Sequence, residues 1–236
     1  MPIYTPGKLT LAKTYVEGDL NYSNVTLLLH GDGTNGSTTI VDSSPSPKTV
    51  TAVGNAQIST AIADPFGNST RAVLAFDGAG DYLTIPAQSA FELANDNFTI
   101  EAFIRVANLS GFKNIVGIAY NNIGGLFFGL SNSNLSVYGN NDGSPIVTGS
   151  AVTANVWSHI ALTKNSGVYK IWHNGVNTAT SATNNTSIIL NNPVSVGAGY
   201  AGLYPFNGYI DELRITKGIA RYQSTFTPPT APFVDA

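Results

Sequence analysis

The chain has 236 residues, of which 11% are charged and 43% are apolar, and its formal net charge is −3. A nearly neutral surface lacks the clustered Lys and Arg residues that nucleic-acid binding requires, so DNA and RNA are excluded as partners. The chain has no Cys, which excludes disulfides and zinc–thiolate sites. No apolar run is long enough to span a membrane, and the first residues lack the pattern of a secretory signal peptide.

Apolar residues recur at every second position in short runs, and Gly- and Asn-rich turns separate these runs, which predicts antiparallel strands rather than helices. In chain order, we expect strands at residues 25–30, 71–76, 81–86, 97–106, 114–120, 125–130, 134–139, 157–164, 168–174, 195–200 and 209–216. The pair Asn174-Gly175 predicts a two-residue type I′ turn between two of them. The sequence therefore predicts an all-β fold, a two-sheet antiparallel β-sandwich.

No change of composition divides the middle of the chain, so we expect one domain over residues 22–217. Residues 1–21 are interpreted as an N-terminal extension that docks on a neighbouring subunit, because they are too apolar for a free tail. Residues 218–236 are interpreted as a Pro-rich C-terminal extension, since prolines at 228, 229 and 232 disfavour regular structure.

Four segments occur in an order that resembles a known family. They are "VLAFDGAGDYLTIP", "FTIEAFIRV", "VWSHIALTKNSGVYKIWHNGV" and "FNGYIDELRITKGIARY". Together they resemble the laminin-G-like domains of the concanavalin-A-like lectin/glucanase superfamily, with Phe103 where that family usually has Trp. The resemblance implies a jelly-roll sandwich with one convex and one concave sheet, and ligands on the concave face or at the loop rim. The C-terminal "ITKGIARY…FTPPTAPF" is similar to versions found in tailed-phage virion proteins.

Two consecutive acids, Asp211 and Glu212, lie in the last predicted strand. Strict alternation would place Asp211 on one face with Leu213, and Glu212 on the other face, where Arg214 can form an ion pair with it. Carboxylates that point apart cannot act together on one glycosidic bond. The Glu-x-Asp-x-Glu pattern of the β-glucan hydrolases in this superfamily is also absent, so we expect a protein that is not an enzyme.

Asp211 is expected to be half-buried, and a buried carboxylate needs hydrogen-bond donors or a cation. Backbone N–H groups of a turn are one solution. Calcium is the other, because Ca²⁺ binds hard oxygen ligands. Laminin-G-like relatives often hold calcium with acids around the first and last strands, and this resemblance implies Asp32, Asp42 and Asp211 as the ligands.

A neutral surface with aromatic rings and Asn amides suits sugars, which present flat apolar faces beside hydroxyl groups. Core packing is the alternative role for the tryptophans. The candidate ligand-binding residues are Trp172, Tyr138, Tyr120, Tyr204, Asn121, Asn122, Asn140, Asn141 and Asp142.

Three classes of function remain open. The first is a non-catalytic glycan-binding adhesion module on a phage virion, which would bind a host-surface polysaccharide and contact other virion proteins, as a homo-oligomer. The second is a purely structural virion protein, a capsid decoration or tail component. The third, the least favoured, is a glycoside hydrolase. Because no secretory signal is recognised, the expected location is the virion surface, which becomes extracellular after lysis.

Overall fold

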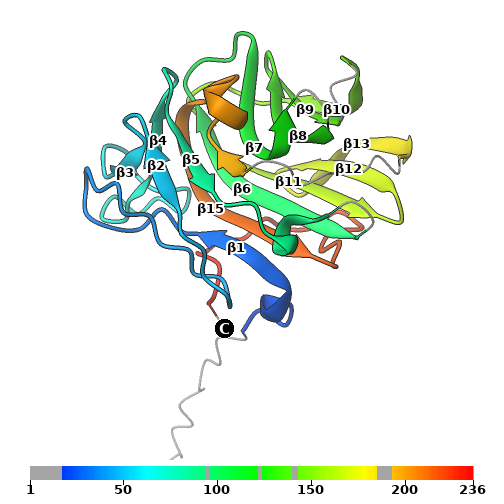
Figure 1. The fold of residues 1–236 in the computed structure, drawn as a ribbon, viewed down its shortest axis with the longest axis horizontal. Coiled ribbons are helices and arrows are strands. Elements are labelled where there is room, and N and C mark those ends of the chain that lie inside the picture. Colours follow the sequence, from blue (N-terminus) through cyan, green and yellow to red (C-terminus); the bar gives the residue numbers. More distant parts are fainter. Residues whose placement is uncertain (1–17, 94–95, 122–123, 140–142, 185–192, 236) are drawn as a thin grey trace, which may run out of the picture.

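The computed structural model describes residues 18–93, 96–121, 124–139, 143–184 and 193–235. Within these residues the chain forms two antiparallel β-sheets that pack face to face (Figure 1), together with three short 3₁₀ helices. The expected all-β sandwich is confirmed. No helix in the described ranges is long and apolar enough to cross a membrane.

The larger sheet, here called sheet A, has the strand order β13-β12-β11-β6-β15-β4-β3, and β1 also pairs with β15. The N-terminal half of β15 pairs with β4, and its C-terminal half pairs with β1. The strands are β1 (Val25–Leu29), β3 (Gln57–Ser59), β4 (Val73–Asp77), β6 (Phe98–Val106), β11 (Ser158–Asn165), β12 (Val168–His173), β13 (Val176–Thr183) and β15 (Asn207–Lys217).

The second sheet, sheet B, has the strand order β10-β9-β8-β7-β14-β5-β2. Its strands are β2 (Thr51–Val53), β5 (Tyr82–Ile85), β7 (Phe112–Asn121), β8 (Gly124–Ser131), β9 (Asn134–Gly139), β10 (Pro145–Ala151) and β14 (Val194–Val196). The 3₁₀ helices are η1 (Tyr22–Asn24), η2 (Ser89–Phe91) and η3 (Tyr200–Gly202).

The core lies between the sheets because each strand presents alternate apolar side chains inward. On β6, Phe98, Ile100 and Ile104 are buried in it, as their spacing predicts. On β8 the inward residues are Leu126, Phe128 and Leu130, so Phe127 points to the outer face of sheet B. The hairpin turn at Asn174-Gly175 is also confirmed, because both residues have positive φ.

The alternation predicted for the last strand is wrong. Asp211 is opposite Phe103, but Arg214 is opposite Glu101, so β15 contains one extra residue between these pairs. Glu212 takes up this β-bulge with a φ of 49°. Consequently Leu213 points into the core, while Asp211, Glu212 and Arg214 all lie on the outer side of sheet A.

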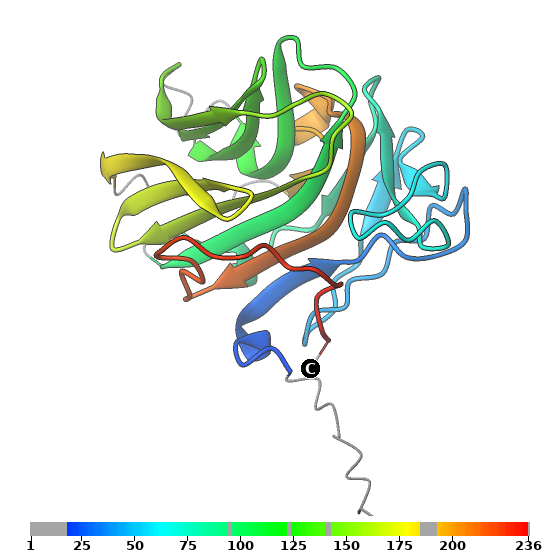
Figure 2. The same cartoon turned by 180° about the vertical axis from the view of Figure 1, so that it is seen from behind.

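Residues 218–235, here called the C-terminal strap, contain no helix or strand. Figure 2 shows the strap, drawn in red, running along the outer face of sheet A. It begins beside β6, where the Arg221 backbone N–H donates to Thr99, and it reaches β15, where the Phe233 N–H donates to Glu212. The strap therefore covers this face of the sandwich.

Candidate functional site

The outer face of sheet A contains charged side chains that pair with one another beneath the strap. Arg214 contacts Glu101 at 2.8 Å and Asp19 at 3.0 Å, and Arg221 contacts Asp19 at 2.7 Å. Tyr222 of the strap donates to Glu101. Burial alone would raise the pKa of Glu101, but Arg214 and its other partners outweigh it and lower the pKa to about 2. These ionised groups serve the packing of the strap.

Trp172 also lies beneath the strap, so its predicted role as an exposed sugar platform is wrong. Its side chain is 1% exposed, and its indole N–H donates to the Thr163 hydroxyl. The rings of Phe226 and Tyr222 cover it at centroid distances of 5.7 and 6.4 Å. Period-two alternation could not reveal this burial because the covering residues, Tyr222 and Phe226, lie 50 and 54 positions further along the chain.

Two of the three acids proposed for calcium, Asp42 and Asp32, have separate partners. Asp42 accepts the backbone N–H groups of Leu28, Ser44 and Lys48, and so fixes the turn after β1. Asp32 pairs with Arg71 at 2.7 Å. Within the described ranges, no group of three or more His, Asp or Glu side chains is arranged to hold a metal ion. Asp32, Asp42 and Asp211 are therefore not gathered into one such group in this structure.

Asp211 is fully buried, and neither of its carboxyl oxygens accepts a well-formed hydrogen bond from the described residues. Burial, together with the neighbouring charge of Glu212, raises the pKa of Asp211 from 3.8 to about 9. Its carboxyl group is therefore protonated at neutral pH. Glu212 accepts hydrogen bonds from the Arg71 guanidinium and the Phe233 backbone N–H, and it contacts His30 at 2.9 Å. The predicted ion pair between Glu212 and Arg214 is therefore wrong, because Arg214 pairs with Glu101 and Asp19 instead.

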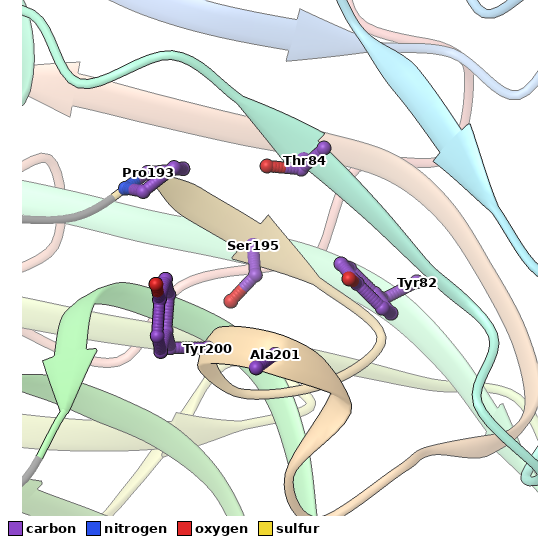
Figure 3. A pocket seen from close by; sticks show the side chains of 6 residues that line it. All are labelled: Tyr82, Thr84, Pro193, Ser195, Tyr200 and Ala201. Carbon is purple, nitrogen blue, oxygen red and sulfur yellow. The ribbon is translucent and has the colours of Figure 1, made fainter.

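Sheet B carries a different kind of surface on its outer face. A pocket of about 170 Å³ lies over β5 and β14 and is lined by Tyr82, Thr84, Pro193, Ser195, Tyr200 and Ala201. In Figure 3 the rings of Tyr82 and Tyr200 lie on either side of Ser195, whose hydroxyl points between them. Alternation explains this lining: Leu83 and Val196 face the core, so Tyr82, Thr84 and Ser195 face outward.

An aromatic cluster continues this surface over β7, β8 and β9. It consists of Phe112, Phe127, Tyr138 and Tyr204. The ring of Phe112 lies 5.7 Å from that of Tyr138 and 5.5 Å from that of Tyr204, and Phe127 lies beneath the other three. Phe127 is buried, whereas Phe112 is 43% exposed and Tyr204 is 39% exposed. The cluster therefore presents ring faces and edges to solvent.

One turn connects the pocket with the aromatic cluster. Tyr200 and Ala201 line the pocket, and Tyr204 belongs to the cluster. Ala201 and Tyr204 both have a φ of 55°, a left-handed conformation that costs a residue other than Gly about 1–2 kcal/mol. The Asn114 backbone N–H donates to the Tyr204 carbonyl and ties the turn to β7. Strained residues of this kind concentrate at functional sites.

Asn114 is a second unusual feature beside the pocket. Its side chain is fully buried, and neither amide atom has a hydrogen-bond partner among the described residues. A Cβ atom on Gly117 would lie 2.6 Å from the Asn114 Nδ2 and 2.8 Å from the Ser195 Oγ, so both groups lie next to this glycine. A buried amide without a hydrogen-bond partner costs about 1–3 kcal/mol, so Asn114 is a costly feature of the surface beside the pocket.

The structure brings together two of the predicted ligand-binding residues, Tyr138 and Tyr204. Tyr120 and Asn121 belong to β7, but their side chains lie outside the described residues, as do Asn122, Asn140, Asn141 and Asp142. Sequence reasoning missed Tyr82, Tyr200, Phe112 and Phe127. Tyr82 and Phe127 are aromatic residues at outward positions of otherwise apolar strands. An aromatic residue at a position where alternation expects a polar one could have indicated this surface.

The fold resembles solved structures at low sequence identity. Domain 4 of AbnA, an extracellular arabinanase of Geobacillus stearothermophilus solved with arabinotriose, aligns with a TM-score of 0.63 and 17% identity over 83% of this chain and 93% of that chain. The binding domain of botulinum neurotoxin DC, solved with SialylT, aligns with a TM-score of 0.60 and 18% identity over 83% of this chain and 48% of that one. The chain thus spans about half of the neurotoxin domain.

A comparison with curated protein sequences finds no match. A family model does match, over residues 77–221, which run from the end of β4 through β15 to the start of the strap. This range covers more than half of the chain and contains β5, β14 and the 199–204 turn, which supply the pocket. The chain belongs to the laminin-G-like domain family of the concanavalin A-like lectin/glucanases superfamily.

Proposed function

We propose that this protein is a non-catalytic glycan-binding module, and that the pocket between Tyr82 and Tyr200 binds a sugar ring. The observation that carries the proposal is the pocket lining. Two tyrosine rings flank the hydroxyls of Thr84 and Ser195, and no charged residue lines the space. The phenol rings suit the apolar C–H faces of a sugar. The Thr84 hydroxyl can donate to and accept from its hydroxyl groups, and the Ser195 hydroxyl, which donates to the Gly117 carbonyl, can accept from them.

The strained turn supports the same proposal. Holding Ala201 and Tyr204 in the left-handed region fixes Tyr200 before a ligand arrives, which lowers the entropy lost on binding. Structures of the same fold also include a domain solved with arabinotriose and a toxin domain solved with SialylT. These ligands belong to those proteins, and they make a glycan the first ligand class to test.

For the biological setting, we propose an adhesion role at the surface of a phage virion, with a host-surface polysaccharide and other virion proteins as partners. The similarity of the C-terminal segment to phage virion versions of the domain supports this setting. Single sugar sites are weak, so a homo-oligomer would gain affinity through multivalency. Docking of residues 1–21 on a neighbouring subunit is the proposed means of attachment.

A purely structural virion role is the second candidate, and the strap is the observation that favours it. Arg214, Arg221, Asp19 and Glu101 form a buried ion network that holds the strap on the outer face of sheet A. Such a covered face suits a durable scaffold. Hydrolysis is less favoured because the pocket lining contains no carboxylate to act as acid or nucleophile.

The test is a glycan array probed with the purified chain and with two matched variants. Tyr200→Ala removes a ring from the pocket, and Tyr209→Ala removes a half-buried tyrosine from the outer face of sheet A. Binding that Tyr200→Ala abolishes and Tyr209→Ala retains supports the proposal. If the folded chain binds no glycan, or if Tyr200→Ala binds as the parent does, the glycan site is wrong and the scaffold role is favoured.

A further inference from the structure

We infer that the ligand is an uncharged, linear oligosaccharide of several units, which extends from the pocket onto the aromatic cluster of Phe112, Phe127, Tyr138 and Tyr204. This inference rests on the proposed glycan-binding function and adds to it the length and the charge class of the ligand. Three observations carry it: the size of the pocket, the turn that contributes both Tyr200 to the pocket and Tyr204 to the cluster, and the lack of charged side chains among the described residues of both.

The pocket is too small to account for the whole surface. Its volume of about 170 Å³ lies well below the roughly 300–1,000 Å³ of pockets that enclose drug-sized ligands. The space between Tyr82 and Tyr200 therefore suits one ring of a ligand. The neighbouring units of a chain must then lie on the adjoining surface of sheet B.

The aromatic cluster offers that surface. Phe112 and Tyr204 leave about two fifths of their area exposed, and Tyr200 at the pocket is 42% exposed. Tyr204 lies four residues after Tyr200 in the same turn. The Tyr204 carbonyl accepts a hydrogen bond from the Asn114 backbone N–H, and Asn114 lies beside the pocket residue Ser195. Exposed aromatic surface beside a pocket is typical of an interaction site, which is why we place the further units of the ligand here.

Charge determines which chains fit. The described residues that line the pocket and form the cluster include no Asp, Glu, Lys, Arg or His. Lys113 follows Phe112 in sequence, but its ammonium donates to the Ser110 carbonyl. A bound carboxylate is normally held by charge-assisted hydrogen bonds from Arg or Lys. A chain of uronic or sialic acids would lose its hydration here without such a partner, whereas an uncharged chain would not.

A glycan fits this surface better than a protein segment does. The surface combines aromatic rings with residues that carry hydroxyl groups, Thr84 and Ser195 in the pocket and Tyr138 and Tyr204 in the cluster, and each unit of a glycan likewise has an apolar face and hydroxyl groups. A protein hot spot would instead place aromatic residues at the centre of a larger patch with a charged or polar rim. An oligosaccharide, and not a protein segment, is therefore the ligand that we infer.

Calorimetric titration of the whole chain tests both the length and the charge class of the ligand. The probes are arabinan and β-glucan fragments of one to six units, uronic-acid oligomers of the same lengths, and SialylT. We expect the affinity for one of the neutral series to rise about tenfold or more between one unit and four, because additional rings reach the cluster. The acidic probes should bind more weakly than that neutral series at equal length.

Variants show which rings cause the increase of affinity with oligosaccharide length. Phe112→Ala and Tyr138→Ala should remove the increase with length but keep the affinity for a single unit, whereas Tyr200→Ala should weaken every length. Tyr209→Ala on sheet A is the control, and thermal melting checks that each variant is folded. Affinity that does not change with length, or tighter binding of an acidic series, would overturn this inference while leaving a sugar pocket intact. Failure of every glycan to bind would overturn the proposed function as well.

Discussion

The rings of Phe112 and Tyr204 pack with their centroids 5.5 Å apart, although Phe112 begins β7 and Tyr204 lies in the turn before β15. The same turn places Tyr200 over Ser195 in the pocket. A single strained segment thus shapes both the pocket and the aromatic cluster. The pocket and the aromatic cluster therefore share the outer face of sheet B, whereas the strap runs along the outer face of sheet A.

Trp172 should behave as a core residue. Because it is buried beneath Phe226 and Tyr222, Trp172→Ala should lower the free energy of unfolding by about 3–5 kcal/mol. Tyr200→Ala, at a partly exposed ring, should lower it by about 1 kcal/mol or less. Urea unfolding followed by circular dichroism measures both values. A Trp172→Ala protein as stable as the parent would contradict the covered position of this ring.

Removal of residues 218–236 should destabilise the whole domain rather than release an independent tail. The truncation takes away Phe226 and Tyr222, which cover Trp172, as well as Arg221, which pairs with Asp19. The expected result is a lower melting temperature together with red-shifted tryptophan emission, since Trp172 becomes exposed to water. Phe112→Ala, an exposed ring on the other sheet, is the matched control. Unchanged melting and emission would show that the strap is dispensable.

Asp211→Asn should stabilise the protein increasingly as the pH rises. The folded-state pKa of about 9 lies above the ordinary value of 3.8, so the folded state retains a proton that the unfolded state has lost between these values. The contribution of this carboxyl to stability is therefore complete below about pH 4 and decreases as the pH rises towards 9, by at most about 1.4 kcal/mol per pH unit.

Asn cannot ionise, so the Asp211→Asn variant does not lose stability at this position as the pH rises. Urea unfolding at pH 5, 7 and 8 should show that the stability of Asp211→Asn relative to the parent increases at each step. A relative stability that stayed constant with pH, or that decreased, would mean that Asp211 is already ionised in the folded protein at pH 5.

Calcium should leave the melting temperature unchanged. A site occupied at about 100 times its dissociation constant would add roughly 2.7 kcal/mol to stability, a clear shift. Asp42 already accepts three backbone N–H groups and Asp32 pairs with Arg71, so these acids offer no shared site. Melting in EDTA and in millimolar Ca²⁺ tests this. A rise that Asp211→Ala abolished would restore Asp211 as a calcium ligand.

The sequence predicted the long strands well because their period-two pattern reflects burial on one face. β6, β9 and β12 lie within one residue of the ranges expected from alternation. It missed β2, β3, β10 and β13, which are short or carry few buried apolar residues, so that their pairing is set by neighbouring strands rather than by their own pattern.

The candidate site was only partly predictable, for two physical reasons. Alternation fails at a bulge, and the extra residue at Glu212 moved both acids of β15 to one side of sheet A. Coverage by distant segments is also invisible in a local pattern, so Trp172 was taken for an exposed ring. Tyr138 and Tyr204 were predicted as candidate sugar-stacking aromatic residues, Tyr138 beside an Asn-rich loop, but their assembly with Phe112 depends on strand order.

An NMR titration of the labelled chain with the tightest-binding neutral oligosaccharide shows directly where the ligand lies. We expect the largest chemical-shift changes at Tyr82, Thr84, Ser195 and Tyr200, with further changes at Phe112 and Tyr138, while the Trp172 indole signal stays in place. Changes centred on Trp172, Lys170 and Tyr222, at the edge of the strap, with none at Tyr82 or Tyr200, would place the ligand on sheet A and refute the proposed site.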